Sequence, residues 1–193
     1  MSLITTAASR TLDGVEIPGS GTWDIDPSHT TVGFVARHLM VAKVRGRFGS
    51  FAGSAQIADQ PEQSSVRVEI EAASVDTHDD GRDTHLRSAD FFDVETHPQI
   101  TFVSTGFTQT GTTSFDLPGE LTIRGVTRPV VLKAEFDGLA GDPWGGTRAA
   151  FTAATEIDRE DFGLTWNKAL ESGGVLVGKT IKIEIDAELV RKA

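Results

Sequence analysis

The sequence predicts an all-β protein, built as a barrel or sandwich of about eight antiparallel strands. Apolar and polar residues alternate along much of the chain, as they do in strands that have one dry face and one wet face. Short turn sequences separate these stretches, and helix signals are few. With 193 residues, of which 38% are hydrophobic, the chain has the size of one domain with a sizeable core.

The N-terminal segment differs from the rest of the chain. Its residues are small and polar, and they become rich in glycine toward position 21. We predict a flexible extension over residues 1–21 and a single domain over residues 22–193, because no other linker and no strong internal repeat is evident.

Strands are predicted most clearly over residues 66–72, 130–137 and 181–189, where the alternation is regular. In the first of these, Val66, Val68 and Ile70 share one face, while charged residues occupy the other. Weaker alternation predicts further strands over 30–36, 44–58, 99–106, 115–123 and 147–157.

Turns and helices fill the intervals. Arg124-Gly125 indicates a hairpin turn, DPWGG at 142–146 places proline where a turn favours it, and Gly173-Gly174 marks another break. Acidic residues followed by apolar residues at helical spacing predict one short helix over 79–92. A second short turn is predicted over 159–164, and we interpret its DFG triplet as a tight turn because the other kinase motifs are absent.

Many of the residues predicted to face inward are small, which favours a barrel with an internal cavity over a filled barrel. They are Ala36, Gly53, Ala55, Ala134, Ala149, Ala153 and Ala187. We expect phenylalanine, isoleucine, leucine and valine to line this cavity.

Composition excludes several classes of protein and site. The chain has no cysteine, no apolar run long enough to cross a membrane, and no basic start followed by an apolar core. These features predict a cytoplasmic protein without stable membrane insertion. The net charge of −10 argues against a nucleic-acid partner. No Gly-x-Ser-x-Gly elbow, Walker loop or dinucleotide fingerprint is present.

Basic residues gather in one stretch, from Pro27 to Ala58, which contains no carboxylate. It carries Arg37, Lys43, Arg45 and Arg47, together with His29 and His38. Two interpretations stay open: solvated strand faces, or a local site for an anion.

Two histidines at or next to the predicted helix raise the question of a metal site. His78 and His85 lie two helical turns apart, close to Asp79, Asp80 and Asp83. We favour capping and bracing of a surface helix, and predict no metal.

The stretch RDTHLRSADFFD, residues 82–93, suits an element that lies across a barrel end. Leu86 and Phe92 would dip toward the cavity, while Arg82 and Arg87 stay at the rim. Lid and plug both fit this pattern.

Several long motifs in sequence order resemble those of the YceI-like family of lipocalin-like polyisoprenoid-binding proteins. They are WDIDPSHTTVGFVARH at 23–38, VRGRFGSFAG at 44–53, SVDTHDDGRDTHLRSADFFD at 74–93, HPQITFVST at 97–105, GELTIRGVTRPV at 119–130, DPWGGTRAAF at 142–151 and DREDFGLTWN at 158–167. The resemblance runs from about Trp23 to Leu189 and leaves the first 21 residues outside.

The resemblance implies an extended eight-stranded antiparallel barrel, partly closed by one or two short helices, with a long apolar tunnel. It implies an isoprenoid lipid as ligand, either an isoprenoid quinone or a polyprenyl diphosphate, and no other cofactor. Because members of the family dimerise, a homodimer is a further expectation. The residues expected to line the tunnel are Phe34, Phe48, Phe51, Leu86, Phe91, Phe92, Phe102, Phe136, Phe151 and Trp166.

The basic stretch supplies the predicted head-group contacts, because arginine can donate two hydrogen bonds to a diphosphate. They are Arg37, His38, Arg45 and Arg47, joined by Arg82 and His85. For a quinone ring, His38 and Trp166 are the expected contacts.

Three functions are compatible with the sequence. The favoured one is a non-enzymatic protein that binds, carries or sequesters an isoprenoid lipid. The second is a structural or stress-related module with a filled barrel. The third is an enzyme that acts on a bound lipid, with His38 or His85 as acid or base.

Overall fold

The computed structural model describes residues 8–39, 41–143, 145–171 and 173–192. Its strands are β1 (Ser9–Leu12), β2 (Val15–Pro18), β3 (Gly21–Ile25), β4 (Thr31–His38), β5 (Ala42–Phe48), β6 (Phe51–Ile57), β7 (Ser65–Glu71), β8 (Val75–Asp76), β9 (Gln99–Ser104), β10 (Thr108–Gln109), β11 (Ser114–Ile123), β12 (Val126–Gly141), β13 (Thr147–Asp158) and β14 (Val177–Arg191). The helices are α1 (Asp80–Arg87) and the short 3₁₀ turns η1 (Pro61–Gln63), η2 (Ala72–Ser74) and η3 (Arg159–Phe162).

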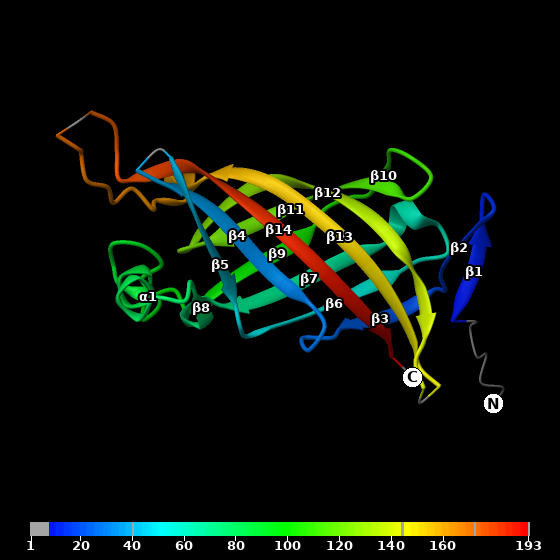
Figure 1. Ribbon diagram of the computed structural model, residues 1–193. Helices are drawn as coiled ribbons and strands as arrows, with labels where there is room; N and C mark the ends of the chain where they lie inside the picture. The colour runs from blue at the N-terminus through cyan, green and yellow to red at the C-terminus, as the bar shows by residue number, and fades with distance from the viewer. Residues whose placement is uncertain (1–7, 40, 144, 172, 193) are drawn as a thin grey trace.

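Eight antiparallel strands close into a barrel, which confirms the predicted fold class. The order around the barrel is β14, β13, β12, β11, β9, β7, β6 and β3, and β3 pairs with β14 again. Figure 1 shows the barrel as an elongated body with α1 and β8 at one end and the β1–β2 hairpin at the other.

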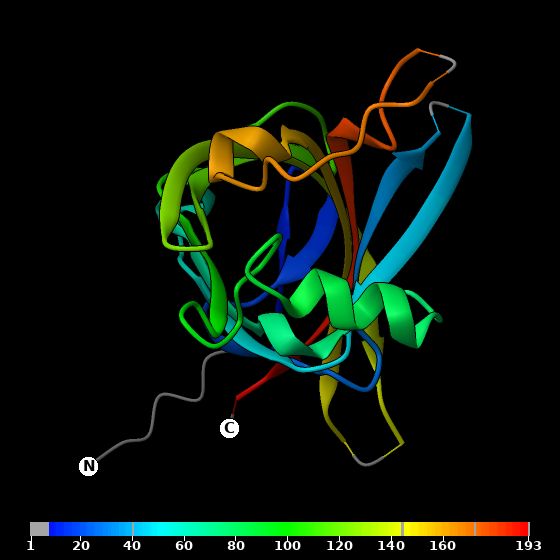
Figure 2. The ribbon, with the colours of Figure 1, turned by 90° about the vertical axis from the view of Figure 1, so that its left-hand side faces the viewer.

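Strand β14 is the seam of the barrel, because one of its edges pairs with two strands in succession. Thr31 to Ala36 of β4 pair with β14 from Asp186 to Ile181, and β3 takes over from Leu189 onward. Strands β4, β5 and β8 therefore continue the sheet away from the ring, and Figure 2 shows β4 and β5 projecting from the barrel wall. Helix α1 lies below them, across the barrel end.

The predicted strands form, with two differences. The stretch 44–58 is two strands, because the chain turns between Phe48 and Phe51. Strand β3 was not predicted, since it supplies only one fully buried side chain, Trp23. The predicted turn at 142–146 includes Trp144, which lies outside the described residues.

The N-terminal segment carries a feature that the sequence analysis did not predict. Strands β1 and β2 form a separate two-stranded hairpin, joined by Asp13 and Gly14, whose φ angles are 50° and 82°. An Asp-Gly pair with two positive φ angles is the favoured two-residue hairpin turn. Val15 and Ile17 pack against the core cluster around Trp23. Residues 1–7 lie outside the described residues.

Helix α1 is shorter than predicted and ends at Arg87. Asp79 is its N-cap and accepts a hydrogen bond from the backbone N of Arg82 at 2.8 Å. Within the helix, buried Asp83 accepts bonds from the backbone N and the hydroxyl of Thr77, which fixes α1 to the end of β8. The second predicted turn forms as η3, and Gly163 ends it with φ 77°.

Candidate functional site

An apolar cavity runs through the barrel. It encloses about 360 Å³, within the range of ~300–1,000 Å³ that is usual for small-molecule sites. At one end its walls are Leu86, Phe91, Phe92, Phe162 and Leu164, and at the other they include the β1–β2 hairpin. Because the lining spans both ends, the cavity has the shape of a tunnel.

Strand alternation decides which side chains reach this cavity. On β4, Val32, Phe34 and Ala36 line it, whereas Val35 and Arg37 do not. On β13, Ala153 and Ile157 line it, and Arg159 follows two residues after Ile157. Gly53 and Ala149 do not line the cavity, but the other five small residues predicted to face inward do: Ala36, Ala55, Ala134, Ala153 and Ala187.

Most of the side chains predicted for the tunnel line the cavity. They are Phe34, Phe48, Leu86, Phe91, Phe92, Phe102, Phe136 and Phe151. Phe51 and Trp166 do not: Phe51 is buried in the larger core cluster, and the Trp166 ring packs against His85 and Phe91 at centroid distances of 4.6 and 5.4 Å. Contact with a ligand stays a prediction for all of them.

The segment 82–93 forms the end wall of the cavity. Leu86, Phe91 and Phe92 line it, and α1 lies across this end of the barrel (Figure 2). Arg82 and Arg87 bond to nearby backbone instead, Arg82 to the carbonyl of Thr77 and Arg87 to the carbonyls of Ala73 and Val75. The segment therefore contributes its apolar side chains to the site, whereas its arginines hold it in place.

The predicted head-group arginines of the basic stretch lie on the wet face of the sheet. Arg45 pairs with Glu184 at 3.1 Å and Arg47 pairs with Asp76 at 3.2 Å, and both side chains are more than half exposed. Arg37 is exposed as well. Alternation accounts for two of them: Ala36 and Phe48 line the cavity, so their sequence neighbours Arg37 and Arg47 point outward.

His38, Arg82 and His85 do not line the cavity either, so the structure brings none of the six predicted head-group residues to it. The His85 ring forms a hydrogen bond with the Asp90 carboxylate at 2.8 Å, and the rings of Phe91 and Trp166 pack edge-on against it. Contact of these six residues with a head group stays a prediction, and their position outside the cavity does not support it.

Two other arginines do line the cavity, and the sequence analysis missed both. Arg159 is 3% exposed and donates hydrogen bonds to the backbone carbonyls of Leu164, Val177 and Gly178. Burial lowers the pKa of its guanidinium. The period of two that runs along β13 through Ala153 and Ile157 could have indicated its inward position.

Arg10 lines the opposite end of the cavity, at the β1–β2 hairpin. Most of the polar lining residues gather with it: Ser64, Ser65, Gln109, Thr112, Thr113 and Ser114. Ser65, Gln109 and Thr112 are exposed, whereas the lining residues Phe91, Phe162 and Leu164 of the α1 end are buried. The cavity is therefore apolar and closed at α1, and polar and accessible to solvent at the hairpin.

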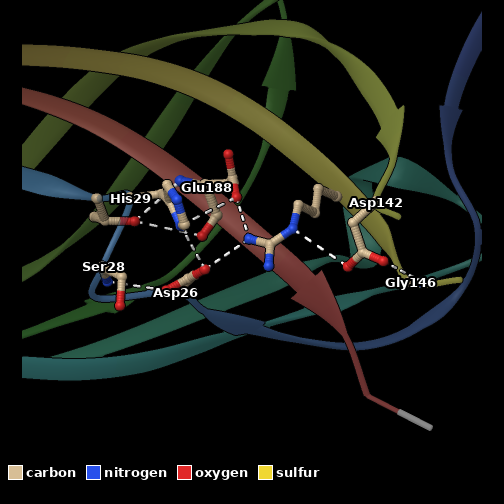
Figure 3. A network of polar contacts seen from close by, with 8 residues as sticks. Asp26, Ser28, His29, Asp142, Gly146 and Glu188 are labelled. Carbon is tan, nitrogen blue, oxygen red and sulfur yellow. Dashed lines mark hydrogen bonds and ion pairs between the residues drawn. The ribbon is translucent and has the colours of Figure 1, made fainter. Parts of the chain in front are cut away.

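A polar network on the outer wall of the barrel is a second candidate site (Figure 3). Ligand atoms of Asp26, His29 and Glu188 lie within 4.8 Å of one another. Arg148 donates to Asp26 at 2.6 Å and also to Glu188, and it pairs with Asp142 at 3.4 Å. Because a guanidinium already compensates these carboxylates, we assign the cluster as an ion-pair network and not as a metal site.

The network stabilises the place where β14 changes partner from β4 to β3. Asp26 and Thr30 begin and end the loop between these two strands, and the backbone carbonyl of Glu188 accepts a bond from the backbone N of Asp26 at 2.8 Å. The Thr30 hydroxyl in turn accepts a bond from the backbone N of Glu188 at 3.0 Å. The cluster thus joins the two strands that would otherwise separate at the seam.

This network predicts acid sensitivity. Hydrogen bonds from Arg148, then from His29 and the backbone of Ser28, hold the pKa of Asp26 well below its ordinary value of 3.8. Since the folded-state pKa is lowered, ionised Asp26 stabilises the fold at neutral pH, and this contribution is lost as the pH falls below that value. We expect the free energy of unfolding, measured with urea, to fall less steeply between pH 5 and pH 2 in Asp26→Asn than in wild type. Equal slopes would contradict the assignment.

In the described parts of the chain, no helix is long and apolar enough to cross a membrane.

Comparisons with known proteins agree with this architecture. The YceI-like domain family model matches residues 23–189. A UPF0312 protein from Azotobacter vinelandii is 45% identical over 142 residues, which cover 73% of this chain and 74% of that protein. A crystal structure of a YceI protein from Campylobacter jejuni has a TM-score of 0.70 at 28% identity, over 81% of this chain and 90% of that one.

A more distant structure shares the fold. A polyisoprenoid binding domain from Saccharophagus degradans has a TM-score of 0.69 at 16% identity, over 88% of this chain and 98% of that one. The matched residues include every strand of the closed barrel, from Trp23 in β3 to Leu189 in β14. The chain therefore belongs to the YceI-like domain family.

Proposed function

We propose that this protein binds an isoprenoid lipid in the barrel cavity and carries or sequesters it without chemical change. The observation that supports this most strongly is the cavity itself, which is lined almost entirely by apolar side chains and runs the length of the barrel. The similarity to a polyisoprenoid binding domain supports the same class of ligand.

The physical chemistry of burial favours such a ligand. Burying about twenty chain carbons at ~0.8 kcal/mol each gives roughly 16 kcal/mol before the costs of association and chain ordering. An apolar tunnel therefore supplies affinity through the chain, and the head group needs only to set its direction. We propose an isoprenoid quinone or a polyprenyl diphosphate, both of which place an oxygen-bearing head on an apolar chain.

The two alternative functions receive less support. A structural module with a filled barrel does not account for a cavity of about 360 Å³. An enzyme using His38 or His85 would need that histidine at the bound lipid, and neither lines the cavity. The cytoplasmic location and the homodimer stay predictions.

Mass spectrometry of the purified protein tests the proposal. We expect native spectra to show a stoichiometric adduct, and organic extraction to release an isoprenoid lipid. An empty spectrum, followed by no uptake of added quinone or polyprenyl diphosphate, would overturn the proposal and favour the structural module.

A further inference from the structure

We infer that Arg10, on the N-terminal hairpin, binds the oxygen-rich head group of the lipid and so sets its direction in the tunnel. This inference rests on the proposed function and extends it to a residue outside the family match, which begins at Trp23. The head would lie at the hairpin end and the chain would extend toward α1.

The surroundings of Arg10 leave one donor free. Its Nη1 and Nη2 atoms donate to the backbone carbonyls of Asp59 and Ala58 at 2.5 and 2.6 Å. Its Nε is buried and has no hydrogen-bond partner among the described residues. A buried donor without a partner costs free energy, and such groups in native proteins call for an explanation. A ligand oxygen at this end of the cavity would supply the missing acceptor.

The charge of Arg10 is only weakly compensated. Its one ion pair among the described residues joins Nη1 to the Asp59 carboxylate at 3.7 Å, and the Asp59 side chain is 89% exposed. A solvated, distant carboxylate offsets little of the positive charge. An anionic head is therefore better matched to Arg10 than a neutral one, because hydrogen bonds between ionised groups are the stronger kind.

Arg159 at the other end is a poorer candidate for the same role. Each of its three nitrogens already donates to a backbone carbonyl, and aromatic and aliphatic residues close that end. The hydroxyl and amide groups of the lining gather at the hairpin instead. The two ends thus differ in chemistry, which is what a ligand with one polar end requires.

The hairpin also places apolar side chains near Arg10, on the side where the lipid chain would begin. Leu12, Ile17 and Pro18 line the cavity, and the segment is held by bonds from Ser9 to Glu16 and from Ser20 to Asp59. The hairpin therefore forms part of the wall of the site. The hairpin lies outside the residues that the family model matches.

Titration with geranylgeranyl diphosphate and geranylgeraniol, which differ only at the head, tests the inference. We expect wild type to bind the diphosphate more tightly. Arg10→Met should weaken the diphosphate by at least about tenfold, the size of one lost charge-assisted hydrogen bond, and leave the alcohol within about threefold. Arg45→Met is the matched control, because Arg45 also pairs with a carboxylate but lies on the outer face; it should change neither affinity.

Asp59→Asn separates a head-group role from a structural one. It removes the nearby carboxylate while the carbonyl contacts to Arg10 stay, so diphosphate binding should be kept or tighten slightly and alcohol binding should not change. Equal loss of both lipids in Arg10→Met, or loss of diphosphate binding in Asp59→Asn, would overturn the inference. Failure of wild type to bind either lipid would instead overturn the proposed function.

Discussion

Replacing Ala153 with tryptophan is expected to weaken the binding of a geranylgeranyl lipid by at least about 100-fold while the barrel stays folded. Ala153 lines the cavity, and its partners on the two neighbouring strands are Ala134 of β12 and Ile185 of β14. An indole there would take the space of the lipid chain. Excluding even four chain carbons at ~0.8 kcal/mol each removes roughly 3 kcal/mol of binding free energy. Calorimetric titration measures the loss.

Ala154→Trp provides the matched control for this prediction. Ala154 is the next residue on the same strand, and it pairs with Lys133 and Glu184, both on the outer face. The same change in volume there should leave lipid affinity unaltered. Unchanged affinity in Ala153→Trp, with the fold verified by circular dichroism, would show that the lipid does not occupy this cavity.

Replacing Arg159 with methionine is expected to lower the free energy of unfolding by about 2–4 kcal/mol, because three buried carbonyl groups lose their donor. Those carbonyls, on Leu164, Val177 and Gly178, join η3 to the start of β14. Removing a buried charge offsets part of this loss. Urea unfolding monitored by tryptophan fluorescence measures the change.

Arg128→Met serves as the control for Arg159, since exposed Arg128 has one hydrogen bond within the described parts of the chain, to the carbonyl of its neighbour Thr127. Its effect should stay within about 0.5 kcal/mol. If Arg159→Met were as stable as Arg128→Met but had lost lipid binding, Arg159 would have to be reassigned from the end wall to the head-group site.

Local pattern was sufficient to predict most of the strands and much of the lining of the cavity. A period of two places Val66, Val68 and Ile70 on one face whatever the strand pairs with, and all three line the cavity. The small residues Ala134 and Ala153 were informative for the same reason. Their volumes indicate unfilled space before any strand pairing is known.

Charge density along the chain did not indicate which residues line the cavity, because alternation was not applied to it. Arg37 and Arg47 are sequence neighbours of the cavity residues Ala36 and Phe48, and for that reason they face away from the cavity. The hairpin at residues 9–18 was missed although its Asp13-Gly14 turn is a hairpin signal. Two strands of four residues carry too little alternation to distinguish them from a loose extension.

Local sequence pattern was enough to indicate an antiparallel barrel or sandwich, one apolar face on each strand, and small inward residues that leave a cavity. These properties depend on residues two positions apart, so a short stretch of sequence shows them. The polarity of the two cavity ends, in contrast, depends on the closed barrel. Arg10 meets Ala58 and Asp59 about fifty positions away, and Arg159 meets Val177 and Gly178 across the closed end. Such contacts depend on how distant segments close the barrel, which no local pattern specifies.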